Sequence, residues 1–260
     1  MDPRALTSGH PMTRAHEWIA GARHLFVLTG AGVSAESGVP TFRDAQTGLW
    51  ARYDPLELAT PDAFERDPVL VWRWYAHRRE LIARVEPNAA HRALANWQKQ
   101  RPMTLATQNV DGLHARAGSR DVIELHGNLF DDTWFRGCGR CSLDVARAVQ
   151  PDHPPQCGSC GAMLRPGVVW FGEALPERAL DAAQQAAASS DVCLVVGTSG
   201  MVYPAAGLPM IAAEHGARVI IVNPQRSDLD HDADIVLYQK AAECLPLLLA
   251  APDANGGISQ

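Results

Sequence analysis

The chain has 260 residues, of which 47% are apolar and 20% charged, enough for the core of one large domain or of one domain with a smaller insert. A formal net charge of −6 leaves no broad basic surface, so nucleic acids are not expected as partners. No apolar run has the length of a membrane-spanning helix, and residues 1–12 lack the hydrophobic centre of a signal peptide. We therefore expect no membrane partner and, by default, a cytoplasmic location. The sequence leaves the oligomeric state open, and a monomer is favoured.

The predicted elements begin with an amphipathic helix over residues 13–22 and a buried strand over the apolar run 24–29. A helix over 87–100 follows later, with a proline in its first turn. The pattern then predicts the strands 103–107, 122–125, 192–196 and 219–222 and the helices 176–188 and 205–215. This alternation is typical of an α/β fold with a Rossmann-like, doubly wound parallel sheet, in which ligands gather at the carboxyl ends of the strands.

An aromatic-rich stretch over residues 45–80 interrupts the alternation after the first strand. Its prolines, Pro55, Pro61 and Pro68, are expected to break it into short helices. A loop-rich insert beside a nucleotide site suits the wall or lid of a substrate pocket.

A glycine-rich turn, Gly30-Ala31-Gly32, follows the first strand. Because glycine has no Cβ, the backbone N–H groups of Gly30 and Gly32 can approach a pyrophosphate, and Arg43 can add a charge. The next glycine is Gly38, so the spacing is not the dinucleotide fingerprint Gly-x-Gly-x-x-Gly. On these residues alone, an ordinary strand-to-loop turn is an equal alternative.

Four of the six cysteines form two Cys-x-x-Cys pairs with fifteen residues between them: Cys138, Cys141, Cys157 and Cys160. This spacing is typical of a structural zinc ribbon, and four thiolates close the zinc tetrahedron to substrate. Two disulfides are the alternative, but a cytosolic chain would not keep them oxidised. The surrounding segment, 131–164, is too short to fold alone and is expected to need the ion.

Polar residues follow the predicted strands at the edge where ligands gather. Gln108, Asn109 and Asp111 come after the strand 103–107, where an Asx-type turn is the plain alternative. His126 follows the strand 122–125 and is the histidine best placed to act as a general base, against the alternative of a structural histidine. The corresponding positions after the two later strands hold Gly197, Thr198, Ser199 and Asn223.

Residues 30–43, Gly-Ala-Gly-Val-Ser-Ala-Glu-Ser-Gly-Val-Pro-Thr-Phe-Arg, resemble the NAD-binding signature of the sirtuins, the NAD-dependent protein lysine deacylases. Further matches follow in that family's order at 107–114, 125–127, the cysteine pairs, 168–173, 197–199 and 222–223. The resemblance implies one catalytic domain over 12–250. Its Rossmann-like part would span about 12–43, 86–130 and 172–250, and a small domain 44–85 and 131–171 with the zinc ribbon at 138–160. Residues 251–260 are expected to be a disordered tail.

The resemblance also implies roles for individual residues. His126 would remove a proton from a ribose hydroxyl after the acyl-lysine oxygen attacks the ribose carbon that carries nicotinamide. Asn109 would assist catalysis and, with Asp111, hold the nicotinamide carboxamide. Contacts to NAD, the co-substrate, are implied for Gly30, Ala31, Gly32, Ser34, Phe42, Arg43, Gln108, Asn109, Asp111, Gly197, Thr198, Ser199, Asn223 and Ala241. The cofactors implied are thus NAD and one structural Zn²⁺.

Partners implied by the resemblance are acylated-lysine proteins or peptides, whose backbone would pair as an added strand with Val168, Val169, Phe171 and Gly172. Tyr75 and Arg78 are three residues apart, so on a helix they can converge on one carboxylate. A buried tyrosine beside a solvated arginine is the alternative.

The Tyr75 and Arg78 pair matches the Tyr-x-x-Arg motif of the sirtuins that remove succinyl and malonyl groups, and Ala59 matches the small residue that widens their acyl pocket. We therefore expect removal of succinyl and malonyl groups, with acetyl also accepted. Gly167 departs from the family pattern, which has histidine before this segment.

Two other functions use the same NAD pocket. One is mono-ADP-ribosyl transfer to protein, and the other is a non-catalytic module that binds NAD or ADP-ribose. A redox dehydrogenase is disfavoured, because the loop is not the usual fingerprint and no acidic residue closes a compact βαβ unit about twenty residues later.

Overall fold

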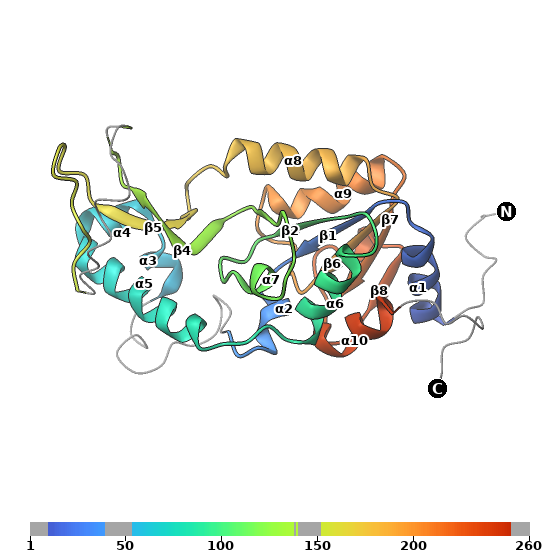
Figure 1. Cartoon of the computed structure of the whole chain (residues 1–260). Helices are drawn as coiled ribbons and strands as arrows, with labels where there is room; N and C mark the ends of the chain where they lie inside the picture. Colours follow the sequence, from blue (N-terminus) through green and yellow to red (C-terminus); the bar gives the residue numbers. More distant parts are fainter. Residues whose placement is uncertain (1–9, 40–53, 138, 140–151, 251–260) are drawn as a thin grey trace.

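The computed structural model describes residues 10–39, 54–137, 139 and 152–250, which form a large and a small part (Figure 1). The large part is built on one sheet with the strand order β3-β2-β1-β6-β7-β8, and every pair in it is parallel. Its strands are β1 (Leu25–Thr29), β2 (Met103–Thr107), β3 (Ile123–Glu124), β6 (Val192–Val196), β7 (Arg218–Val222) and β8 (Ile235–Leu237). The predicted doubly wound sheet is confirmed.

Helices cover both faces of this sheet. They are α1 (Pro11–Gly21), α2 (Gly32–Ala35), α6 (Ala89–Gln98), α7 (Leu113–Arg116), α8 (Glu177–Ala188), α9 (Leu208–Glu214) and α10 (Ala241–Leu248), with 3₁₀ turns η4 (Ala205–Gly207) and η5 (Asp230–Asp232). In β1, Leu25 and Val27 pack in the cluster that includes α1, α6 and α10. Phe26 and Leu28 pack in the opposite cluster with α8 and α9. Burial on both faces explains why β1 is a continuous apolar run.

The small part, at the left of Figure 1, combines three helices with an antiparallel hairpin. The elements are α3 (Pro55–Leu58), α4 (Pro61–Arg66), α5 (Pro68–Ala83), β4 (Gly127–Trp134) and β5 (Leu164–Val168). They share one buried cluster in which Phe64, Trp74 and Trp170 are the large side chains. The hairpin at the ends of the predicted insert therefore packs directly on the helices.

The prediction that prolines break residues 45–80 into short helices is wrong for the third helix. Each proline instead begins a helix, and α5 runs for 16 residues. Proline is tolerated at the first helical position because its missing N–H has no partner there. Thr60 and Asp67 cap α4 and α5 by accepting hydrogen bonds from backbone N–H groups.

Other boundaries also differ from the prediction. Pro87 precedes the helix, and α6 begins after Asn88, which forms a capping box with His91. β3 is limited to two residues, and the predicted helix 205–215 is η4 followed by α9. The strands β4 and β8 and the helix α10 were not predicted. No helix in the described parts of the chain has the length and hydrophobicity to cross a membrane, and the expected tail, 251–260, lies outside those parts.

The loops that follow β1 and β6 pack backbone against backbone. Gly30 N–H donates to Val196 O at 2.9 Å and Gly32 N–H to Gly197 O at 2.8 Å. A Cβ on Gly32 would lie 2.7 Å from Gly197 Cα, and one on Gly197, whose φ is +62°, would lie 2.4 Å from Val33 N. The glycines are therefore required by contacts inside the protein, in addition to any approach of a phosphate.

We expect Gly32→Ala to lower the free energy of unfolding by about 1–3 kcal/mol, because the added methyl group meets backbone that cannot move aside. Urea denaturation measures this change. Gly21→Ala is the matched control, since nothing lies within 4 Å of its added Cβ. Equal stability of the two variants would contradict the packing argument.

Candidate functional site

The edge of the sheet at which ligands are predicted to gather is formed by the carboxyl ends of neighbouring strands. Gln108 follows β2, and its backbone N–H donates to Thr29 O at the end of β1, at 2.9 Å. Its Nε2 donates to Thr198 Oγ1, after β6, at 3.1 Å. Its carbonyl oxygen lies 2.8 Å from Nδ1 of His126, after β3. The sheet thus brings together the polar residues that the sequence places after separate strands.

Asn109 and Asp111 are buried and share one partner, Ser34. Asn109 Nδ2 donates to Gly30 O at 3.0 Å and to Ser34 Oγ at 3.2 Å. Ser34 Oγ donates to Asp111 Oδ2 at 2.7 Å, and Leu113 N–H donates to Asp111 Oδ1 at 2.9 Å. Burial raises the pKa of Asp111, while the hydrogen bonds from Leu113 and Ser34 oppose that rise. The Asx-type contact expected as the alternative is therefore present, but it is one bond of a larger network.

Two buried histidines that the sequence analysis did not single out lie beside this network. His91 Nδ1 accepts from Asn88 N–H at 3.3 Å, so Nε2 carries the hydrogen and donates to Ser34 Oγ at 3.3 Å. His114 Nε2 lies 2.9 Å from Thr29 Oγ1, and the two rings are 4.8 Å apart. Burial lowers the pKa of His91 to about 4 and that of His114 to about 3, so both are neutral at neutral pH. The capping position of His91 after Asn88 is the one sequence signal that points to it.

His126 is half-buried, and the hydrogen bond of its ring to Gln108 fixes its tautomer. A carbonyl oxygen can only accept, so Nδ1 donates to Gln108 O and Nε2 is left without a hydrogen. Burial lowers the pKa of His126, and the bond to Gln108 opposes this shift. The ring is therefore a neutral base at neutral pH, with Nε2 as its basic atom.

Tyr75 and Arg78 lie together on α5, as predicted. Tyr75 is 2% exposed and its Oη accepts from Trp170 Nε1 at 2.9 Å. The Arg78 guanidinium lies over the Trp74 ring, 5.0 Å from its centre, and 6.0 Å from the centre of the Tyr75 ring. Burial raises the pKa of Tyr75 to about 12 and lowers that of Arg78, so the phenol is protonated at neutral pH. The alternative of a fully solvated arginine is wrong, because this side chain is partly buried.

The segment predicted to pair with substrate leaves the hairpin after Val168, the last residue of β5. Val169 N–H donates to His126 O at 2.8 Å, and Phe171 N–H donates to Ala59 O at 2.9 Å. These bonds connect the segment both to His126, the predicted base, and to Ala59, in the wall of the predicted acyl pocket. Because these two amides are already used within the protein, an added strand would pair with other backbone groups of this segment.

Comparison with known proteins agrees with this geometry. A sequence model described as the Sir2 family matches residues 30–204. The chain belongs to the Sir2 family. An NAD-dependent protein deacylase of Ralstonia nicotianae is 59% identical over 248 residues, which are 95% of this chain and 100% of the relative. NAD-dependent protein deacylase 1 of Pseudomonas aeruginosa is 54% identical and covers 90% of this chain and 96% of its own length.

Solved structures of Sir2 proteins share the fold of this sirtuin. A complex of a Sir2 homologue with NAD is 47% identical, with a TM-score of 0.84 over 91% of this chain and 92% of that one. A Sir2 variant with a deacetylated p53 peptide and 3′-O-acetyl-ADP-ribose is 32% identical, with a TM-score of 0.78 over 95% and 99%. The family and the fold expected from the sequence motifs are therefore confirmed.

The structure also describes other residues that were predicted to bind NAD or the substrate. Asn223, after β7, donates through Nδ2 to Thr198 O at 3.4 Å, and Ser199 follows in the same loop. Ala241 is buried and begins α10. Gly172 turns the chain with a φ of +88°. Four predicted site residues lie outside the described residues. They are Phe42 and Arg43, predicted to bind NAD, and Cys138 and Cys141, predicted to bind zinc.

The described half of the cysteine motif forms a tight turn. Gly161 N–H donates to Cys157 O and Cys157 N–H to Ala162 O, both at 2.8 Å, and Gly161 has a φ of +74°. Cys157 is buried and Cys160 exposed. Within the described residues there is no cluster of three or more side chains that could hold a metal ion. This turn fits one half of a four-thiolate zinc site, since each half of such a site is usually a pair of cysteines with this spacing.

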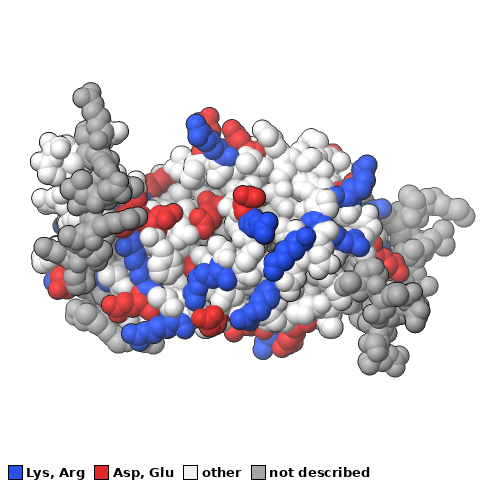
Figure 2. Space-filling model, in the orientation of Figure 1, with Lys and Arg blue, Asp and Glu red and all other residues white. Residues whose placement is uncertain are grey.

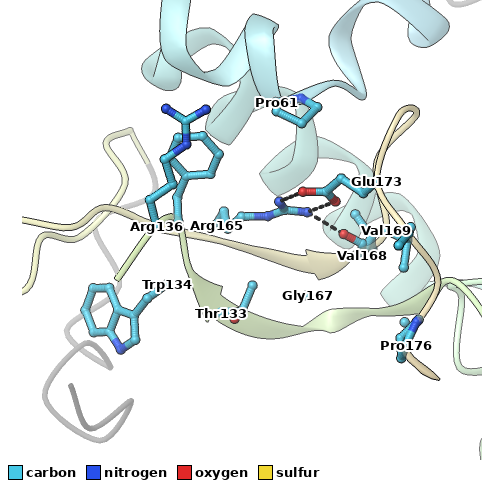
Figure 3. Close-up of a pocket in the computed structure, with 13 residues that line it drawn as sticks. Pro61, Thr133, Trp134, Arg136, Arg165, Gly167, Val168, Val169, Glu173 and Pro176 are labelled. Carbon is cyan, nitrogen blue, oxygen red and sulfur yellow. Dashed lines mark hydrogen bonds and ion pairs between the residues drawn. The ribbon is translucent and has the colours of Figure 1, made fainter. Parts of the chain in front are cut away.

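A cavity of about 610 Å³ opens beside the hairpin, lined by Thr133, Arg165, Val168, Val169 and Glu173 among others (Figure 3). It flanks the predicted substrate segment, and its lining does not include the polar residues at the sheet edge.

On the face shown in Figure 2, positive and negative side chains are interspersed, so this face carries no broad basic surface.

Acid is expected to destabilise this sirtuin through His91 and His114. Their pKa values of about 4 and about 3 in the folded chain lie below the ordinary value of 6.5. The unfolded state therefore binds more protons below about pH 6.5, and the free energy of unfolding falls as the pH falls toward these folded values, by up to about 1.4 kcal/mol per pH unit for each histidine.

Urea denaturation at about pH 7 and about pH 5 measures this slope. His114→Gln should reduce the slope, because the variant lacks one buried titrating ring. His215→Gln, which alters an exposed histidine outside the cluster, is the control. The same slope in His114→Gln and in the parent would show that the buried ring does not account for the acid sensitivity.

Proposed function

We propose that this sirtuin is an NAD-dependent protein lysine deacylase that prefers succinyl- and malonyl-lysine and also accepts acetyl-lysine. Its products would be nicotinamide and O-acyl-ADP-ribose. The names of the similar proteins support the NAD-dependent deacylase activity. The acyl preference rests on one observation, the partly buried Arg78 guanidinium beside the protonated Tyr75 phenol.

The described residues fit NAD at the carboxyl ends of β1, β2 and β6. Asn109 uses both hydrogens of Nδ2 inside the protein, so its Oδ1 can accept a hydrogen bond from a carboxamide NH₂ group. Asp111 lies in the same network and can accept from that group as well. The predicted remainder of the NAD site is the Gly30 to Gly32 turn, Ser34, Gln108 and the loops that carry Thr198 and Asn223.

NAD, when bound, would supply a ribose carbon from which nicotinamide can leave. We assign to His126 the removal of the ribose proton, by Nε2, after the acyl oxygen has attached to that carbon. Its neutral state and half-buried position suit a base near neutral pH. Val169 and Phe171 would present the acyl-lysine to the site, because their segment is bonded to His126 and to Ala59.

Acyl preference is tested by measuring NAD-dependent turnover of one peptide that carries succinyl- or acetyl-lysine. A charge-assisted contact to a carboxylate contributes about 1.5–3 kcal/mol, so Arg78→Met should lower kcat/KM for the succinyl peptide about ten- to a hundred-fold more than for the acetyl peptide. Arg73→Met changes an exposed arginine of the same helix and is the control. A larger loss with the acetyl peptide would refute the assignment of Arg78.

The two alternative functions predict different results in experiments with NAD. Labelled NAD that remains covalently on a protein target would indicate ADP-ribosyl transfer. Failure to turn over NAD with either peptide would favour a binding module. His126→Tyr separates binding from chemistry, because the deacylase proposal expects it to abolish turnover while NAD binding, measured by calorimetry, changes little.

We also propose one structural Zn²⁺ bound by Cys138, Cys141, Cys157 and Cys160, which would join the predicted ribbon to the small domain. Metal analysis of the purified protein should find one zinc per chain. Cys160→Ser should lose most of that zinc and lower the unfolding temperature, whereas Ser159→Ala, which alters the exposed neighbour between the two thiols, should keep both. A full zinc content in Cys160→Ser would contradict the proposed ligand set.

A further inference from the structure

The hydrogen bond between Trp170 and Tyr75 fixes what the tyrosine can offer to a ligand. The two side chains are 1% and 2% exposed, and Trp170 Nε1 lies 2.9 Å from Tyr75 Oη. An indole N–H can only donate, so the phenol oxygen is the acceptor. The hydrogen of the phenol must then point to a different group. Among the described residues, Tyr75 has no hydrogen-bond acceptor for it.

Burial keeps that hydrogen in place. The pKa of Tyr75 is raised to about 12, first by burial and against the opposing charge of Arg78, so the phenol is a donor throughout the neutral range. Arg78 lies one helical turn further along α5 and on the same side. A buried donor and a cation therefore lie close together on α5.

Trp170 itself is held in a fixed position from two sides. The Arg165 guanidinium lies 3.4 Å from the centre of the indole ring and forms two contacts to Glu173, at 2.6 and 3.0 Å (Figure 3). Glu173 Oε2 also accepts from Trp170 N–H at 2.8 Å, and Arg165 donates to Val168 O. Arg165 is 5% exposed, and the carboxylate of Glu173 is partly exposed toward the cavity.

We propose that Trp170 is a positioning residue for the acyl chain: its indole N–H occupies the acceptor side of the Tyr75 hydroxyl and directs the phenol hydrogen toward the acyl carboxylate. Arg165 and Glu173 support this role by fixing the indole. The inference rests on the proposed acyl preference and explains why the tyrosine serves as a donor. A substrate without a carboxylate gains nothing from this arrangement, so Trp170 contributes to selectivity.

A double-mutant cycle tests the coupling between the two residues. W170F, Y75F and the double variant are compared by the ratio of kcat/KM for succinyl and acetyl forms of one peptide. A neutral hydrogen bond is worth about 3- to 10-fold, so W170F should lower this ratio by about that factor, mainly through KM for the succinyl peptide. The double variant should show the same ratio as Y75F, because Trp170 acts only through the tyrosine.

Trp97→Phe is the matched control. Trp97 is also a buried indole with an arginine over its ring, but its Nε1 has no hydrogen-bond partner and it lies in the large part, on α6. The succinyl to acetyl ratio should not change in this variant. If W170F is too unstable to measure, E173Q provides a milder change, and a drop of about 2- to 3-fold in the same ratio is expected.

Two results would overturn the proposal: an equal loss of both activities in W170F, or multiplicative effects of W170F and Y75F in the double variant. The first would mean that the indole only packs, and the second that it acts independently of Tyr75. A parent enzyme that does not remove succinyl groups at all would refute the proposed acyl preference itself. That outcome is distinguishable, since it appears before any variant is made.

Discussion

The backbone contact between the loops after β1 and β6 is the constraint on which the rest of this sirtuin depends. The strand order changes direction between these two strands, and the two loops meet there through Gly30, Gly32 and Gly197. Any side chain at these glycines would push the loops apart. Their close approach brings Thr198 within hydrogen-bonding distance of Gln108, and so aligns the ends of β2 and β6 at the topological switch point.

Beside these loops lies a buried chain of hydrogen bonds in which each donor and each acceptor is fixed. Asn88 donates to His91, His91 to Ser34, and Ser34 to Asp111. The direction holds only while His91 is neutral, which its burial ensures at neutral pH. Because the donors of Asn109 are also used within the protein, the atoms left for a ligand are acceptors. The network thereby selects a donor group such as an amide NH₂.

The small part carries two arginines in contrasting environments. Arg165 forms two hydrogen bonds to Glu173 and a third to Val168 O, which hold the predicted substrate segment in place. Arg78 instead stacks on the Trp74 ring, beside the phenol that Trp170 orients. A guanidinium beside a protonated phenol offers several donors to a carboxylate, which fits an anionic substrate group at this place.

The sequence by itself determined the strands at the centre of the sheet and the types of residue in the loop after each strand, because these follow from local patterns. β6 is a continuous apolar run, and β1 is apolar up to its last residue. Only the tertiary structure decided which loops meet, that His91 and His114 belong to the site, and that Trp170 bonds to Tyr75, 95 residues earlier. No local sequence pattern predicts a contact at that separation. The hydrogen bond forms only when the hairpin packs on α5 and water is excluded from both side chains.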